Sequence, residues 1–151
     1  MKFLGTGLAS VLLVAWVGGL WAIGYIAAPS LFASLADKQL AGNLAGGFFK
    51  WIAYVGMVAG VYLLIFRLGR DGMAALKTGF FWAVLLMLVM TLVQHFGFQP
   101  MLEGLKKQAL PSAVMESAFR SRFVAWHGIS SIVYLIQSVL GLWLVARAKL
   151  A

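Results

Sequence analysis

Cysteine is absent from the 151-residue chain, and charged residues make up only 11% of it. The absence of cysteine excludes disulfides, iron–sulfur clusters, cysteine-ligated zinc and thiol nucleophiles, so any metal must be held by other side chains or by the backbone. A soluble domain carries about 25% charged residues, and the scarcity of charge therefore excludes an ordinary soluble fold. Apolar residues make up 63% of the chain, and its mean hydropathy is +0.96. The composition predicts an integral membrane protein.

Acidic residues are also scarce, with four Asp and Glu against twelve Lys and Arg and a net charge of +8. The basic residues are dispersed between apolar runs and form no stripe, so we expect no nucleic-acid partner. Cations at the ends of apolar segments are typical of membrane topology and of contact with anionic headgroups. No Asp or Glu lies inside any of the long apolar segments that could cross a membrane. This weakens an interpretation as a proton relay or a hydrolase. The lipid bilayer is the expected environment.

Charged residues separate four apolar runs, because an ionised side chain at the bilayer centre costs several kcal/mol. The predicted membrane spans are residues 5–28, 48–67, 78–98 and 123–146, each near the roughly 20 residues that cross a bilayer. Pro29 is expected to end the first span, since the charge-free run over residues 3–36 is too long for one crossing. The sequence therefore predicts an all-α fold, with residues 1–151 forming one domain of four antiparallel transmembrane helices in two hairpins.

The two predicted hairpins share a layout. Spans one and three end near Pro29 and Pro100, and each is followed by a longer, less apolar connection. An old duplication is one explanation. The basic residues divide evenly between the two membrane faces, so the orientation depends on Lys2, which precedes the first span. We expect cytoplasmic termini, in a bacterial inner membrane.

Small residues predict how the spans pack, because close backbone approach is a main source of attraction between helices in lipid. Gly56 and Gly60 form a small-xxx-small pair in span two, and Gly19 and Gly24 belong to similar pairs in span one. We expect these faces to meet. A homodimer contact, or contact with another membrane protein, is the alternative.

Polar residues recur at spacings of three and four in span four, which places them on one helix face. This polar stripe consists of His127, Ser130, Ser131, Tyr134, Gln137 and Ser138. Span three carries Met87, Gln94 and His95 on a similar arc. A polar stripe should face the bundle interior, since lipid cannot satisfy its donors. His95 and His127 are the only histidines, and antiparallel spans would place them at a similar depth, facing each other.

Several interpretations of this stripe stay open. In the first interpretation, the polar groups only form hydrogen bonds between helices, each worth about 0.6 kcal/mol. Alternatively, His95, His127 and Met87 can bind a metal, with copper first because imidazole and thioether suit it. Haem held between the two histidines is a third interpretation, and proton-coupled movement of a small solute is a fourth. A serine-protease-like triad is excluded by the lack of an orienting acid.

Three elements of the sequence carry a family resemblance. Ala28–Phe32 (APSLF) after the first span, Pro100 after the third, and Phe123–Ser131 (FVAWHGISS) opening the fourth are similar to the transmembrane-protein-205-like family of four-span proteins. More distantly, they resemble copper-resistance D type membrane domains. The resemblance implies a four-span membrane fold and adds weight to copper. It marks, residue by residue, Pro29, Phe32, Pro100, Phe123, His127, Gly128 and Ser130.

These observations lead to one functional hypothesis and two alternatives. The leading hypothesis is a non-enzymatic membrane protein whose polar pocket between spans three and four binds or helps to move a small ligand, with a copper-type metal ion as first candidate. The pocket residues are Gln94, His127, Ser130, Ser131, Tyr134 and Gln137. The alternatives are a structural or partner-binding membrane subunit without a ligand and a haem-binding oxidoreductase.

Overall fold

A computed structural model describes residues 2–148, with side chains described from residue 5 onward. This part of the chain contains only helices, turns and short connections. The elements in order are α1 (Lys2–Ala22), η1 (Ile23–Ala27), α2 (Ala28–Ser34), α3 (Lys38–Asp71), η2 (Gly72–Lys77), α4 (Gly79–Val93), η3 (Gln94–Phe98), α5 (Gln99–Ala109), η4 (Val114–Glu116) and α6 (Arg120–Arg147). The segments η1 and η3 are π-helical, and η2 and η4 are 3₁₀-helical.

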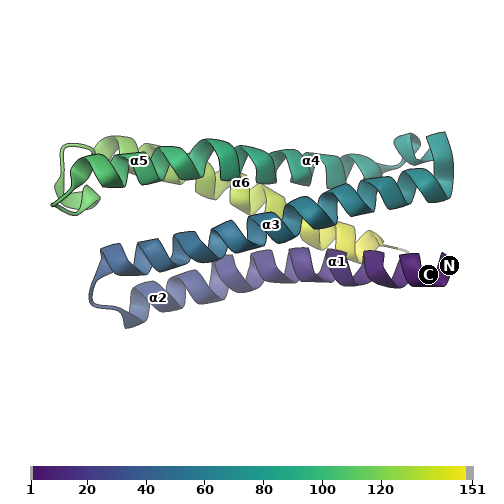
Figure 1. Ribbon diagram of the computed structural model, residues 1–151, viewed down its shortest axis with the longest axis horizontal. Helices are drawn as coiled ribbons and strands as arrows, with labels where there is room; N and C mark the ends of the chain where they lie inside the picture. The colour runs from purple at the N-terminus through teal and green to yellow at the C-terminus, as the bar shows by residue number, and fades with distance from the viewer. Residues whose placement is uncertain (1, 149–151) are drawn as a thin grey trace.

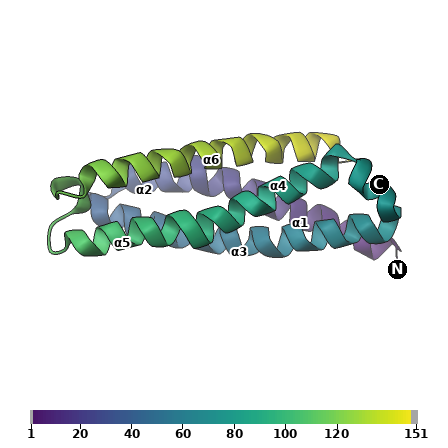
Figure 2. The same cartoon turned by 90° about the horizontal axis from the view of Figure 1, so that it is seen from above.

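Four helical segments of the described chain are long and apolar enough to cross a membrane: Gly5–Ser34, Lys38–Lys77, Gly79–Ala109 and Arg120–Arg147. They run antiparallel as two hairpins, the first built from α1, η1, α2 and α3 and the second from α4, η3, α5 and α6 (Figure 1). This confirms the predicted all-α class. We call the end of the bundle away from the termini the distal end. There α5 and α6 lie side by side over α3 and α2, as Figures 1 and 2 show together.

The helices do not break at Pro29 and Pro100, which differs from the sequence prediction. The helices continue beyond the prolines as α2 and α5. Proline lacks an N–H, and its ring would clash with the carbonyl four residues earlier in an α-helix. Each proline instead follows a π segment, in which Ala28 N–H donates to Ile23 O and Gln99 N–H donates to Gln94 O, five residues earlier. This wider turn accommodates the ring without breaking the helix.

The main hydrophobic core lies in the half of the bundle near the termini. Its fully buried members come from all four spans and include Leu13, Trp16, Leu63, Val84 and Leu144. A second, smaller cluster at the distal end belongs to the second hairpin alone, built on Leu105, Ala109 and Val114. The two hairpins are therefore joined near the termini and diverge toward the distal end, where α3 and α5 separate (Figure 1).

Glycines in this core make room for large side chains of neighbouring helices. A Cβ atom at Gly56 would overlap the Trp16 indole, and one at Gly60 would lie 3.1 Å from Leu88 Cδ1. In span one, a Cβ at Gly19 would overlap Ile52. The glycine faces of spans one and two do contact each other's helices, but each glycine receives a bulky side chain and not another glycine. The space above Gly56 and Gly60 is thus filled by side chains from other helices of the same bundle.

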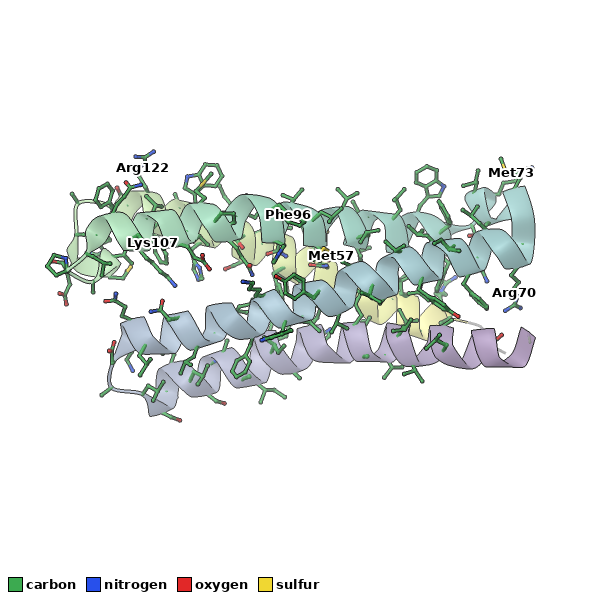
Figure 3. The ribbon with its side chains drawn as sticks, in the orientation of Figure 1. Met57, Arg70, Met73, Phe96, Lys107 and Arg122 are labelled. Atoms are coloured by element: carbon green, nitrogen blue, oxygen red, sulfur yellow. The ribbon has the colours of Figure 1, made fainter. Side chains whose placement is uncertain are left out.

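The fold predicts which positions share a membrane face. Gly72 lies near the termini and Lys107 near the distal end, where Figure 3 labels it. Because the chain has no native cysteine, single cysteines at Lys2, Gly72 and Lys107 can be labelled cleanly. We expect an impermeant thiol reagent to reach positions 2 and 72 from one side and position 107 from the other. Labelling of positions 72 and 107 from the same side would contradict the four-span arrangement. Ala151, also expected beside Gly72, lies outside the described residues.

Candidate functional site

A chain of side-chain hydrogen bonds joins the third and fourth spans. Gln137, only 1% exposed, donates from Nε2 to Thr91 Oγ1 at 2.6 Å and to Met87 O at 3.1 Å. Gln94 Nε2 donates to Gln137 Oε1 at 3.1 Å, and Ser130 Oγ donates to Gln94 Oε1 at 3.1 Å. The spacing of the polar stripe brings these residues together as the sequence suggests. These side chains therefore form hydrogen bonds with one another.

The same stripe also binds the first span. Tyr134 O–H donates to Leu20 O at 2.5 Å, and Trp21 Nε1–H donates to Ser138 O at 3.2 Å. A Cβ atom at Gly24 would overlap the Tyr134 ring, so glycine is needed for this approach. Four of the predicted pocket residues, Gln94, Ser130, Tyr134 and Gln137, therefore form contacts between helices.

The other two predicted pocket residues lie on the surface of the second hairpin. Ser131 Oγ donates to His127 O within α6 at 2.8 Å, and the His127 ring stacks on Phe123 at 5.7 Å between centroids. A Cβ atom at Gly128 would meet nothing within 4 Å. Phe123 and His127 thus share one face at the distal end of α6.

The three predicted metal ligands have different neighbours. His95 lies against α3, with its ring 5.0 Å from that of Tyr54. Met87 is fully buried, and its Cε would lie 3.4 Å from a Cβ at Gly141 in α6. His127 stacks on its own helix. Among the described residues, no group of three or more His, Asp or Glu side chains is arranged to hold a metal ion. None of these contacts joins one predicted metal ligand to another, and binding of copper or haem stays a prediction.

A polar groove of about 190 Å³ lies between α3 and α5, where the two hairpins diverge. We call it the α3–α5 groove. The ring contact between Tyr54 and His95 marks its inner end. Toward the distal end, Lys106 Nζ crosses between the helices and donates to Asn43 Oδ1 at 3.3 Å and to Gly42 O at 3.5 Å. Its lining residues are Lys50, Tyr54, His95, Gln99, Pro100 and Glu103.

Several polar groups in the α3–α5 groove have no partner among the described residues. His95 Nδ1 is buried and makes no hydrogen bond. Lys50 and Glu103 line the same groove, yet the ion pairs of the described chain within 4.0 Å are those of Asp71 with Arg67 and Arg70. Leaving a buried polar atom unpaired costs about 1–3 kcal/mol, and such a group in a folded protein calls for an explanation. Lys50 and Glu103 are exposed, so among these three residues this cost applies to His95 Nδ1 alone.

The sequence prediction found His95 but missed the rest of this groove. Lys50 and Tyr54 are four residues apart, and His95, Gln99 and Glu103 repeat at the same interval, so each set lies on one helix face. The second set was not recognised because the third span was expected to end before Gln99. Continuation of the helix through Pro100 converts these residues into a stripe opposite Lys50.

Comparison with known proteins identifies a family but no characterised relative. A family model described as "Domain of unknown function (DUF4149)" matches residues 11–111. No curated protein and no solved structure matches the chain significantly. The match includes both walls of the α3–α5 groove and the Pro29 and Pro100 elements, and it ends before the segment over 123–131. The resemblance to transmembrane-protein-205-like and copper-resistance D type proteins stays a prediction.

Proposed function

Because the chain belongs to the DUF4149 family, whose activity its name leaves open, we propose from geometry that this integral membrane protein binds a small polar ligand in the α3–α5 groove. The observation that carries the proposal is His95, whose buried Nδ1 atom has no hydrogen-bond partner and which lines a groove together with the exposed charges of Lys50 and Glu103. An ionisable residue within a membrane helix, such as His95, is costly and usually marks a functional site. Convergent polar groups in one concave site are the usual basis for ligand binding.

The spacing of charged residues supports a position of the groove near the headgroup level of the bilayer. Lys50 and Arg67 are separated along α3 by 67 − 50 = 17 residues, which is roughly 25 Å at 1.5 Å per residue. A hydrocarbon core is about 30 Å thick, so the two cations lie near its opposite boundaries. A ligand would therefore reach the groove from the polar side of the membrane, from the headgroup layer, or from both.

The hydrogen-bond network between spans supports a second role for the polar stripe. Gln94, Gln137 and Tyr134 use their polar atoms on neighbouring helices, which fits a purely structural task for this part of the bundle. The ligand site and the structural network then occupy separate places, with His95 in the groove and Gln94 beside it in the network. A copper-type ion remains a candidate ligand, with His95 as the imidazole donor that the groove offers.

Filling the groove tests the proposal. Gln99→Trp adds a large side chain to the lining, and Gln108→Trp makes the same change at an exposed position of α5. Each protein is purified in mild detergent and examined by native mass spectrometry, with metal content measured in parallel. We expect wild type and Gln108→Trp to retain a non-covalent adduct that Gln99→Trp loses while its thermal stability is unchanged. Stoichiometric copper that His95→Ala removes would make the ligand a metal ion. Equal adducts in all three proteins would refute a ligand in the groove.

A further inference from the structure

The two walls of the α3–α5 groove carry opposite charges. Lys50 comes from α3 and Glu103 from α5, and they form no ion pair within 4.0 Å. Lys106 is the other nearby cation, and its charge attracts that of Glu103. Its Nζ atom, however, donates hydrogen bonds to Asn43 Oδ1 and Gly42 O. The groove thus presents a free ammonium on one side and a carboxylate without an ion-pair partner on the other.

We propose that the α3–α5 groove binds an aminophosphate, a phosphate joined by a short linker to an ammonium group, with the phosphate at Lys50 and the ammonium at Glu103. This inference rests on the proposed function and names the class of its ligand. The same chemistry occurs in free phosphoethanolamine and in the headgroup of phosphatidylethanolamine.

The donors and acceptors of the groove match the two halves of such a ligand. Lys50 supplies three N–H donors, and Gln99, Tyr54 and His95 can each donate one more. Hydrogen bonds from a cation to phosphate oxygens are among the stronger ones in proteins. Glu103 accepts and cannot donate when ionised, so it repels a ligand that is only an anion. A ligand with its own cation turns that repulsion into attraction.

The size and surroundings of the groove favour the lipid as the source of this chemistry. The volume of about 190 Å³ is below the roughly 300–1,000 Å³ of pockets that hold drug-sized ligands. This suits a headgroup, not a whole lipid. Trp51 is 70% exposed and contacts Tyr54, and Phe96 (labelled in Figure 3) is 66% exposed and contacts His95. These aromatic side chains flank the inner end of the groove and offer apolar surface to acyl chains.

Lipid competition tests the charge pattern. Purified protein is equilibrated with equimolar phosphatidylethanolamine, phosphatidylglycerol and phosphatidylcholine in nanodiscs, and the retained lipid is measured by native mass spectrometry. We expect wild type to retain phosphatidylethanolamine over phosphatidylglycerol by on the order of tenfold, as one charge-assisted hydrogen bond allows. Glu103→Gln should abolish this preference, and Lys50→Gln should lower retention of all three lipids. Glu116→Gln and Lys77→Gln are matched controls at exposed positions away from the groove, and they should behave as wild type.

A second arm separates the two sources of the aminophosphate. Displacement of the retained lipid by millimolar phosphoethanolamine would show that the headgroup alone is recognised, whereas resistance to displacement would show that the acyl chains contribute. Either result supports the aminophosphate site when the Glu103 dependence holds.

The inference is overturned if wild type retains phosphatidylglycerol as readily as phosphatidylethanolamine, or if Glu103→Gln leaves the preference unchanged. In that case, loss of another adduct in Gln99→Trp would leave the proposed function intact with a different ligand. If Gln99→Trp also keeps every adduct, both proposals fail. Glu103→Asp keeps the negative charge and should therefore retain most of the preference for phosphatidylethanolamine. This variant distinguishes loss of the charge from misfolding as the cause of an effect in Glu103→Gln.

Discussion

Replacing Gly56 with leucine is expected to lower the free energy of unfolding by about 3 kcal/mol, the upper part of the usual cost of overpacking a core. Gly56 is buried in α3, and even a Cβ atom there would overlap the indole of Trp16. Trp16 is itself fully buried beside Leu13 and Leu63, so the indole has no open space into which it can move. Reversible unfolding in detergent, followed by denaturant titration, measures the loss.

Two further glycines provide the comparison for Gly56. Gly47 lies in the same helix, and a Cβ atom there would meet nothing within 4 Å, so Gly47→Leu should change stability by less than about 0.5 kcal/mol. Gly60→Leu should fall between the two, because a Cβ atom there would lie 3.1 Å from Leu88 Cδ1 and 3.3 Å from Trp16 Cη2, which is tight but less so than the overlap with Trp16 at Gly56. Unchanged stability in both Gly56→Leu and Gly60→Leu would mean that this face of α3 meets lipid and not Trp16.

The four-span architecture was predictable because it depends on two coarse quantities, the spacing of charges and the length of apolar runs. Both are set by the cost of placing charge in hydrocarbon, so they can be seen without any knowledge of packing. The path of the helices past Pro29 and Pro100 was not predictable in this way. It depends on the hydrogen bonds that Ala28 N–H and Gln99 N–H donate to carbonyls five residues earlier. No pattern of apolar residues indicates such bonds.

The polar stripe of α6 was visible in the sequence for a similar reason, since a spacing of three and four fixes a helix face. Its partners were only partly visible. Gln94 was identified on span three, and the structure places it in the network with Gln137. The expected pairing of His95 with His127 stays a prediction, and it was made for a regular helix through span three. The π segment η3 changes the helical phase from Gln94 onward by up to roughly 100°, one residue of an α-helical turn. The His95 ring contacts Tyr54 of α3.

The α3–α5 groove was hidden from the sequence because it arises from an absence of packing. Neither Lys50 nor Glu103 was predicted to belong to a site, because charged residues beside apolar runs are ordinary in membrane proteins. Their common groove exists because the main core joins the hairpins near the termini and leaves α3 and α5 apart at the distal end. The position of a core along a bundle depends on where large side chains such as Trp16 find a glycine opposite them, and this is a property of pairs of helices.

The second large effect is expected for Gln137→Leu, which should lower the free energy of unfolding by about 2 kcal/mol. The change removes three hydrogen bonds, those of Gln137 with Thr91, Met87 O and Gln94. Each is worth about 0.6 kcal/mol on average between membrane helices. Leucine fills a similar volume, so the loss reports the hydrogen bonds and not a cavity. Unfolding in detergent measures it, with Gln108→Leu at an exposed position of α5 as the control.

A double-mutant cycle shows whether the loss comes from the network. Gln137→Leu leaves the Thr91 hydroxyl without its side-chain donor, although Thr91 Oγ1 still donates to Met87 O at 2.9 Å. Replacing both partners by apolar groups can be nearly neutral, whereas replacing one leaves a buried polar atom unsatisfied. Thr91→Val combined with Gln137→Leu should therefore cost less than the sum of the single changes, by about 1 kcal/mol, as expected for residues in one network. Additive losses would show that Thr91 and Gln137 stabilise the bundle independently. In that case the stripe would pack α6 against α4 without acting as a connected polar network.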